Sequence, residues 1–270
     1  MKIIDGLYIP EKHTIIPGRP LWPDIGRLPR LPRPDLPPFW ELAIAQRAGA
    51  ALAFASASAG NLTAFNCQTN DAVVVTVEIK TTTASVSSIT DTIGNTYAVG
   101  QSLAINNGTS CRVEEWWANS IGANASNVIT VNLAGGPVKF VVSAESYSGA
   151  LSFGNTNTTT GSSTAPAITL TTQDTNNWIA TGASAIGLPT LTATTPNVVR
   201  QTAVTSGGGS STNVRGGEGD AGAFASAGSN TVTFTLGATG AWATAGLELR
   251  TVAPSERHQT RHIRMPVGFH

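Results

Sequence analysis

Residues 73–80 read Val-Val-Val-Thr-Val-Glu-Ile-Lys, and this stretch decides the fold class. Its odd positions are Val, Val, Val and Ile, and they alternate with Val, Thr, Glu and Lys at the even positions. A period of two is the pattern of a β-strand with one buried face, and β-branched residues favour strands. We therefore predict a strand here that presents its odd positions to a hydrophobic core.

Further strand-like runs follow along the chain, and Gly, Asn or Pro separates most of them. Many short strands at this spacing are typical of a sandwich or a jelly roll. We predict an all-β fold, an antiparallel, jelly-roll-like β-sandwich over residues 51–251, with 155–164 and 206–211 as exposed loops. The predicted strands are 86–90, 96–99, 111–118, 127–133, 138–147, 167–172, 178–186, 198–204, 213–219, 230–236 and 242–250. The predicted bulky core members are Trp116, Trp117, Tyr147, Trp178, Phe234 and Trp242.

The distribution of charge excludes a nucleic-acid groove. Residues 1–50 carry seven basic and five acidic side chains (+2), residues 51–250 six and ten (−4), and residues 251–270 three and one (+2). A nucleic-acid site would gather Lys and Arg on one face of the body. The basic ends instead indicate protein-docking segments, of which residues 252–270 form a short basic C-terminal tail.

Residues 1–38 contain nine of the fifteen prolines. Proline fixes φ, removes a hydrogen-bond donor and pushes its predecessor toward extended geometry, so we predict an extended docking arm of largely polyproline II character. Regular apolar residues interleaved with arginines indicate that the arm lies along a protein surface. That surface belongs either to neighbouring subunits or to the chain's own sandwich. The predicted partner-binding residues of the arm and its junction are Tyr8, Trp22, Leu28, Arg30, Leu31, Arg33, Phe39 and Trp40.

Residues 39–50 have the only helical spacing, with Phe39, Leu42 and Ile44 toward one side, and predict a short helical connector after two prolines. The apolar run 47–59 is either the first strand or a displaced export signal. We expect no secretory signal at the start of the chain and no membrane span, because no apolar run is long enough.

Three motifs then follow in a characteristic order. Residues 90–97 read Thr-Asp-Thr-Ile-Gly-Asn-Thr-Tyr, 127–131 read Asn-Val-Ile-Thr-Val, and 144–149 read Ala-Glu-Ser-Tyr-Ser-Gly. This order resembles a β-sandwich module that recurs in phage structural proteins and bacterial surface proteins, from which the chain departs by the additional Ser146. The resemblance covers residues 52–251. It implies the fold and an adhesive or decorating role.

The residues needed for most enzymes are missing from the predicted sandwich. All four histidines, His13, His258, His262 and His270, lie in the arm or the tail, so no Ser-His-Asp site and no histidine-ligated zinc is expected in the body. A glycosidase would need Glu145 beside Glu114 or Glu115 in a cleft, because Glu114 and Glu115 point to opposite faces of one strand. An inward Glu would otherwise pair with Arg112 or Lys139.

Two smaller features have simpler interpretations. Asp91 with Asn95, or Glu218 with Asp220, offers oxygen ligands to calcium, but turn-forming roles are the simpler explanation. Cys67 and Cys111 lack metal-ligand spacing and are either a disulfide or two buried thiols. We expect no cofactor, no metal and no enzymatic activity.

These observations predict a virion structural protein, a capsid decoration, minor capsid or other particle-surface component. It would be made in the host cytoplasm, would assemble as a homo-oligomer, and would dock on the major capsid or other virion proteins through its arm. The alternative is a carbohydrate-binding or adhesin module on a virion or bacterial surface, in which Trp116 or Trp117 contacts surface glycans. Neighbouring strand positions face opposite ways, so one of the two indoles is expected outside the core.

Overall fold

The computed structural model describes residues 2–4, 7–9, 43–81, 83–106 and 111–251, and these residues form an all-β fold without an α-helix. The chain divides into two units, Met1–Pro38 and Phe39–His270. In the part of the chain that the structure describes, no helix has the length and apolar character needed to cross a membrane. The architecture of the second unit follows from how its strands pair.

The first half of the body contains a large and a small antiparallel sheet. The large sheet has the order β3–β12–β6–β9–β8, and the small sheet has the order β4–β11–β7, while β5 pairs with β10. Their bounds are β3 Ala45–Ala57, β4 Ala59–Asn61, β5 Phe65–Cys67, β6 Ala72–Ile79, β7 Ser85–Asp91, β8 Ala98–Asn106, β9 Cys111–Ala118, β10 Asn124–Asn127, β11 Ile129–Ala134 and β12 Val138–Ser148. The core between the two sheets includes Val73, Val75, Val77, Ile79 and Phe140.

The second half also contains a large and a small antiparallel sheet. The large sheet has the order β13–β20–β15–β18–β17, and the small sheet has the order β14–β19–β16. Their bounds are β13 Ser152–Ser163, β14 Ala167–Thr172, β15 Trp178–Ile186, β16 Leu191–Thr194, β17 Val198–Val204, β18 Val214–Ala221, β19 Gly228–Leu236 and β20 Gly240–Arg250, with a single 3₁₀ turn at Ser210–Thr212. Ile168, Ile179, Val232 and Phe234 lie in the core between these sheets.

The second half repeats the topology of the first. In the large sheets, the order β3–β12–β6–β9–β8 of the first half corresponds to the order β13–β20–β15–β18–β17 of the second. In the small sheets, the order β4–β11–β7 corresponds to the order β14–β19–β16. The strands also keep the same succession along the chain. The body is therefore a tandem structural repeat, in which only the β5–β10 pair has no counterpart among the described strands.

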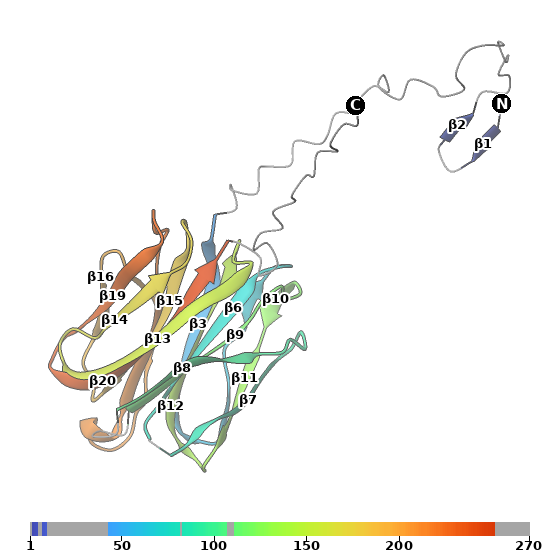
Figure 1. Ribbon diagram of the computed structural model, residues 1–270. Helices are drawn as coiled ribbons and strands as arrows, with labels where there is room; N and C mark the ends of the chain where they lie inside the picture. The colour runs from blue at the N-terminus through green and yellow to red at the C-terminus, as the bar shows by residue number, and fades with distance from the viewer. Residues whose placement is uncertain (1, 5–6, 10–42, 82, 107–110, 252–270) are drawn as a thin grey trace, which may run out of the picture. The chain divides into compact units, whose positions relative to one another are not determined.

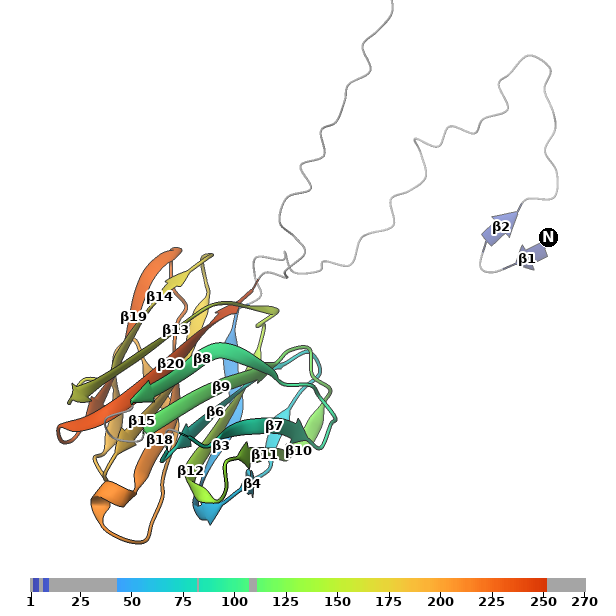
Figure 2. The same cartoon turned by 60° about the horizontal axis from the view of Figure 1, so that its bottom comes forward.

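The two large sheets pack face to face, so the body has four layers, with the small sheets outside (Figures 1 and 2). β12 packs on β18 as β20 packs on β9, and β3 packs on β17 as β13 packs on β8. These reciprocal contacts give the layer between the large sheets, which we call the central interface, the character of a two-fold symmetric dimer contact. What the sequence predicted as one sandwich is thus a stack of two.

Stacking changes the environment of the strand that decided the fold class. All eight residues of β6 are buried, whereas the alternating pattern predicted one buried face. The prediction of one open face was wrong because the even positions, including Thr76 and Glu78, face the second half of the chain. Polar residues in a strand indicate solvent only when no second sheet covers them.

Most predicted strands are confirmed, and the predictions for 111–118, 167–172, 178–186 and 198–204 match observed strands from end to end. Residues 155–164 were wrongly predicted as a loop, because β13 spans Ser152–Ser163 as the edge strand that pairs with β20. Their Asn, Thr and Gly composition suits an edge whose outer side meets water. β16 at Leu191–Thr194 was not predicted.

The helical connector predicted for residues 39–50 is corrected in its described part. Residues 45–50 are the start of β3, which pairs with β12 over most of its length. The backbone pairing of a long neighbouring strand outweighs the weak helical spacing. Ile44, assigned to the apolar side of that helix, is instead buried beside the central interface. Phe39 and Leu42 lie outside the described residues.

Within the predicted arm, the structure describes one short hairpin. β1 (Lys2–Ile4) pairs antiparallel with β2 (Leu7–Ile9), and Ile3 lies opposite Tyr8. The first residues are therefore paired with each other rather than extended alone. The proline-rich residues 10–38 and the tail 252–270 lie outside the described residues.

Candidate functional site

The central interface is a close contact between two sheets of small residues. On one side of it, Gly182 of β15 lies against Thr76 of β6, so that a Cβ at position 182 would collide with the Thr76 methyl group. A Cβ at Gly216 of β18 would lie 2.5 Å from Cδ of Glu78. The two glycines therefore permit the close approach of the sheets and leave room for the Glu78 side chain.

Five carboxylic acids from both halves lie in this layer. Glu115 is opposite Thr76 in the first half, and Glu218 is opposite Gly182 in the second, so both acids lie beside the closest contact of the sheets. All are at most 1% exposed, which is unusual for acids that are not all paired. They are Glu78, Glu115, Glu145, Glu218 and Asp220.

Burial shifts the protonation of these acids. It raises the pKa of Glu78 and that of Glu218 well above the ordinary value, and repulsion from neighbouring carboxylates adds to both shifts. Burial likewise raises the pKa of Glu145 to about 7. A carboxyl group without compensating partners is kept neutral in such a layer, because the charged form loses its hydration. The central interface is therefore stable in its protonated form.

The partners of these acids differ. Asp220 receives hydrogen bonds from Arg200 Nε and from its terminal nitrogen, both at 2.8 Å, and Glu145 accepts one from Gln46 Nε2 at 2.5 Å. Among the described residues, neither oxygen of Glu218 has a hydrogen-bond partner, and the Glu78 carboxyl group has no side-chain partner, with only the backbone amides of Glu78 and Gly217 beside it. No group of three or more metal-ligating side chains with suitable placement occurs in the described ranges. Proton binding is the chemistry that the raised pKa values of this layer support.

The cysteines are free thiols in different layers. Cys67 lies in the core of the first half, whereas Cys111 lies in the central interface. Its Sγ donates toward the Ser184 hydroxyl at 3.0 Å across this interface. Burial raises the pKa of each thiol to about 11. The two positions thus report on different parts of the body.

The glycosidase arrangement is not formed. Glu114 faces the core of the first half, where its Oε1 accepts hydrogen bonds from Arg112 Nε at 2.7 Å and from the Val86 amide at 3.1 Å. The predicted pairing of an inward Glu with Arg112 is thereby confirmed. Glu115 and Glu145 face the central interface and have no exposed surface, so a sugar cannot reach them.

Trp116 and Trp117 do point to opposite faces, but neither offers a solvent-facing platform. Trp116 is 8% exposed in the core of the first half and donates to Glu114. Trp117 is half-buried and packs against Phe153 of the second half, with ring centroids 5.0 Å apart. Trp117 therefore lies outside the core of the first half, as expected, but the second large sheet covers part of that face. Tyr147, Phe234 and Trp242 are buried core members, as predicted.

Asp91 organises the turn that contributes to the family resemblance. Its Oδ1 accepts hydrogen bonds from the amides of Ile93, Gly94 and Asn95, and its Oδ2 accepts from Tyr97 and from the side chain of Asn95. These donors hold the pKa of Asp91 below its ordinary value despite partial burial. The turn-forming interpretation is confirmed for Asp91, since its oxygens are already occupied by donors. Glu218 and Asp220 belong to the central interface instead.

The chain enters and leaves the body at neighbouring points (Figure 1). Ile44 and Leu249 pack in one hydrophobic cluster, and the amide of Leu151 donates to the carbonyl of Arg250 at 2.8 Å. Ser148 Oγ, at the end of the first half, donates to the carbonyl of Ala45 at 3.2 Å. The first and last described residues of the body therefore lie at one end of it.

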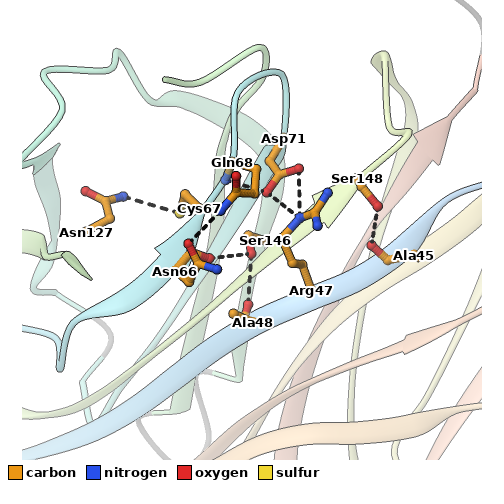
Figure 3. Close-up of polar contacts among 10 residues, drawn as sticks. All are labelled: Ala45, Arg47, Ala48, Asn66, Cys67, Gln68, Asp71, Asn127, Ser146 and Ser148. Atoms are coloured by element: carbon orange, nitrogen blue, oxygen red, sulfur yellow. Dashed lines mark hydrogen bonds and ion pairs between the residues drawn. The ribbon is translucent and has the colours of Figure 1, made fainter. Parts of the chain in front are cut away.

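A polar cluster fixes the start of β3 at this end (Figure 3). Arg47 Nε donates to both oxygens of buried Asp71, at 2.9 and 3.2 Å, and Asp71 Oδ2 also accepts from the Gln68 amide at 2.8 Å. Ser146 Oγ lies within hydrogen-bonding distance of the carbonyls of Ala48 and Asn66. These contacts join the start of β3 to β12 and β5.

The outer surface of the body carries few charges. Among residues 43–81, 83–98 and 111–251, whose exposure is described, Arg47 is the only exposed charged residue, with 38% of its side chain accessible, and it is paired with Asp71. The charged residues that are half-buried are Lys80, Asp91, Lys139, Asp174, Arg200 and Arg215. Ser, Thr, Asn, Gly and Ala form most of the remaining surface, as on β14 and β19, where Thr169 and Thr231 join their hydroxyls at 2.8 Å. Such a surface neither repels copies of itself nor depends on salt for its contacts.

The sequence-predicted partner-binding residues are mostly outside the described part. Tyr8 lies in β2, whereas Trp22, Leu28, Arg30, Leu31, Arg33, Phe39 and Trp40 lie outside the described residues.

Sequence reasoning missed the buried acids of the central interface as a group. The available signal was the presence of Glu78, Glu145 and Glu218 within apolar or glycine-rich strands. No protein-family model, no curated protein and no solved structure matches the chain.

Proposed function

We propose that this chain is a non-enzymatic virion structural protein, a decoration, minor capsid or other particle-surface component. Its proline-rich arm, residues 1–38, and its basic tail, residues 252–270, dock on neighbouring virion subunits, while the jelly-roll-like body is displayed outward. The proposal keeps the extended arm predicted from the proline spacing. It also follows the resemblance of residues 52–251 to modules of phage structural proteins.

The observation that carries the proposal is the common end at which the chain enters and leaves the body. Since Ile44 and Leu249 lie in one cluster, two flanking segments that begin beside them can grip one surface together. Several weak contacts on one surface add up through high effective concentration, and symmetric copies multiply them. The hydrogen bonds between Arg47 and Asp71 hold in place the start of β3, which follows the arm in the chain.

The low charge of the outer surface is consistent with the same role. Copies displayed at high density on a particle lie close together, and like charges on facing surfaces would repel one another. Because Arg47 is the only exposed charged residue among the body residues whose exposure is described, neighbouring copies meet with little of that repulsion. The four layers, each hydrogen-bonded within its sheet, make a rigid displayed unit.

The test is deletion of residues 1–38 in a particle-assembly assay. We expect incorporation into particles to fall by at least about tenfold, because the loss of several apolar anchors costs more than 1.4 kcal/mol in binding. The midpoint of thermal unfolding should stay unchanged, because the body has its own cores. Deletion of residues 252–270 is the matched control and should cost less, since the tail has fewer apolar residues. Normal incorporation of the armless protein would contradict the proposal.

A further inference from the structure

We propose that the central interface is an alkali-sensitive joint: ionisation of its buried carboxyl groups separates the two halves of the body while each half keeps its own fold. This inference does not depend on the proposed function. It concerns the isolated chain in solution, and its test needs no particle.

The two large sheets are in close contact at the central interface. The sheets meet through Gly182 against Thr76 and through Gly216 against Glu78, at positions where not even a Cβ would fit. Glu78 and Glu218 have no exposed surface. Glu218 has no hydrogen-bond partner among the described residues, and only the backbone amides of Glu78 itself and of Gly217 lie beside the Glu78 carboxyl group. A charge created on Glu218 therefore has neither water nor a donor to stabilise it, and a charge on Glu78 has no water, unless the sheets move apart.

The central interface contains more acidic than basic side chains. The acids come from four strands. Glu78 lies in β6, Glu115 in β9 and Glu145 in β12, and both Glu218 and Asp220 lie in β18. Tyr147 and Cys111 also lie in this layer, but burial raises the pKa of both groups, that of Cys111 to about 11, so they stay neutral while the acids ionise. The cations are Arg200 on β17, which is bound to Asp220, Lys80 at the end of β6, and Lys139 of β12, whose Nζ donates to Asn213 of the second half at 2.9 Å. Negative charge accumulates without matching positive charge as the acids ionise.

Each half of the body has a core of its own, so the halves are separable. The cores of the two halves are distinct from the clusters of the central interface, which contain Val74, Leu247 and Ala243 among other small or aliphatic residues. The covalent link between β12 and β13 is short, residues 149–151, and Gly149 there has a φ of +75°. Opening at the central interface therefore leaves every strand ladder within the halves intact.

Cys111 provides the readout. Its thiol is fully buried in the central interface and donates to Ser184 of the opposite half, so a thiol reagent reaches it only when the halves separate. Cys67, fully buried in the core of the first half, has the same raised pKa of about 11 and corrects for the pH dependence of thiolate formation. Single-cysteine variants, C67A and C111A of the full chain, separate the two signals.

The experiment measures labelling of each thiol by a disulfide reagent as pH rises. We expect the rate for Cys111 relative to Cys67 to rise by about tenfold or more as the pH is raised above about 7, the raised pKa of Glu145, and the remaining acids ionise. In the C67A background, the pair E78Q and E218Q should shift this rise to higher pH. The substitution E114Q, a buried acid of the first core, should leave it in place.

Two results would overturn the proposal. One is that Cys111 stays as protected as Cys67 until the whole chain unfolds, which circular dichroism on the same samples detects. The other is that E78Q with E218Q leaves the rise at the same pH as E114Q does. Glutamine matches glutamate in shape, so these variants keep the packing of the central interface.

Discussion

Replacing Gly182 by valine is expected to destabilise the body by about 3 kcal/mol, the upper end of what overpacking costs in a well-packed core. The valine side chain would occupy the space of the Thr76 methyl group, and both positions lie in the middle of paired strands that cannot shift locally. The large sheets must therefore separate or bend. The measurement is the free energy of unfolding in urea.

A matched control exists in the same half. Gly209 lies in the loop before the 3₁₀ turn, has nothing within 4 Å of an added Cβ, and has an ordinary φ of −72°. The variant G209V should unfold within about 0.5 kcal/mol of the unchanged protein, as surface substitutions usually do. Equal effects of G182V and G209V would show that the sheets are not in close contact at Gly182.

Stability is expected to be highest in mildly acidic solution and to fall as pH rises. The pKa of Glu145 is raised from 4.5 to about 7 in the folded chain, so the folded state retains a proton that the unfolded state releases. The contribution is present in full below about pH 4.5 and is lost between about pH 4.5 and pH 7, a change of about 3 kcal/mol. Glu78 and Glu218 extend the loss to higher pH, since their pKa values are raised further.

The check is the midpoint of thermal unfolding measured across this pH range for the unchanged chain and for E145Q. Glutamine can still accept the hydrogen bond from Gln46, so E145Q should flatten the dependence and raise stability at about pH 8. D91N serves as the comparison, because the pKa of Asp91 is lowered by its donors and its contribution is lost only in acid. A stability that rises from pH 5 to pH 8 would contradict the raised pKa of Glu145.

The period-two pattern of residues 73–80 was sufficient to predict the all-β class and most strands, because hydrogen-bonded ladders impose that spacing directly. It was insufficient to predict the second buried face of β6. That face is covered by a sheet more than a hundred residues away in sequence, which pairs small residues and glycines with Thr76 and Glu78.

The structural repeat was hidden for a related reason. β9 reads Cys-Arg-Val-Glu-Glu-Trp-Trp-Ala and its counterpart β18 reads Val-Arg-Gly-Gly-Glu-Gly-Asp-Ala, so few positions other than the acids Glu115 and Glu218 coincide. Backbone pairing preserves the topology while side chains diverge. The candidate site was hidden with it, because the buried acids gather only when the two halves stack. The contact of Trp117 with Phe153 was hidden for the same reason.

The central claim is that the arm contacts neighbouring subunits, and lysine cross-linking of intact particles followed by mass spectrometry tests it most directly. The chain offers four lysines, Lys2 and Lys12 in the arm and Lys80 and Lys139 in the body. Lys139 already donates to Asn213 at 2.9 Å, which makes it a reference point within the body. We predict cross-links from Lys2 and Lys12 to a different virion protein. Cross-links from both arm lysines to Lys80 and Lys139 of the same chain, with none to another protein, would contradict the claim.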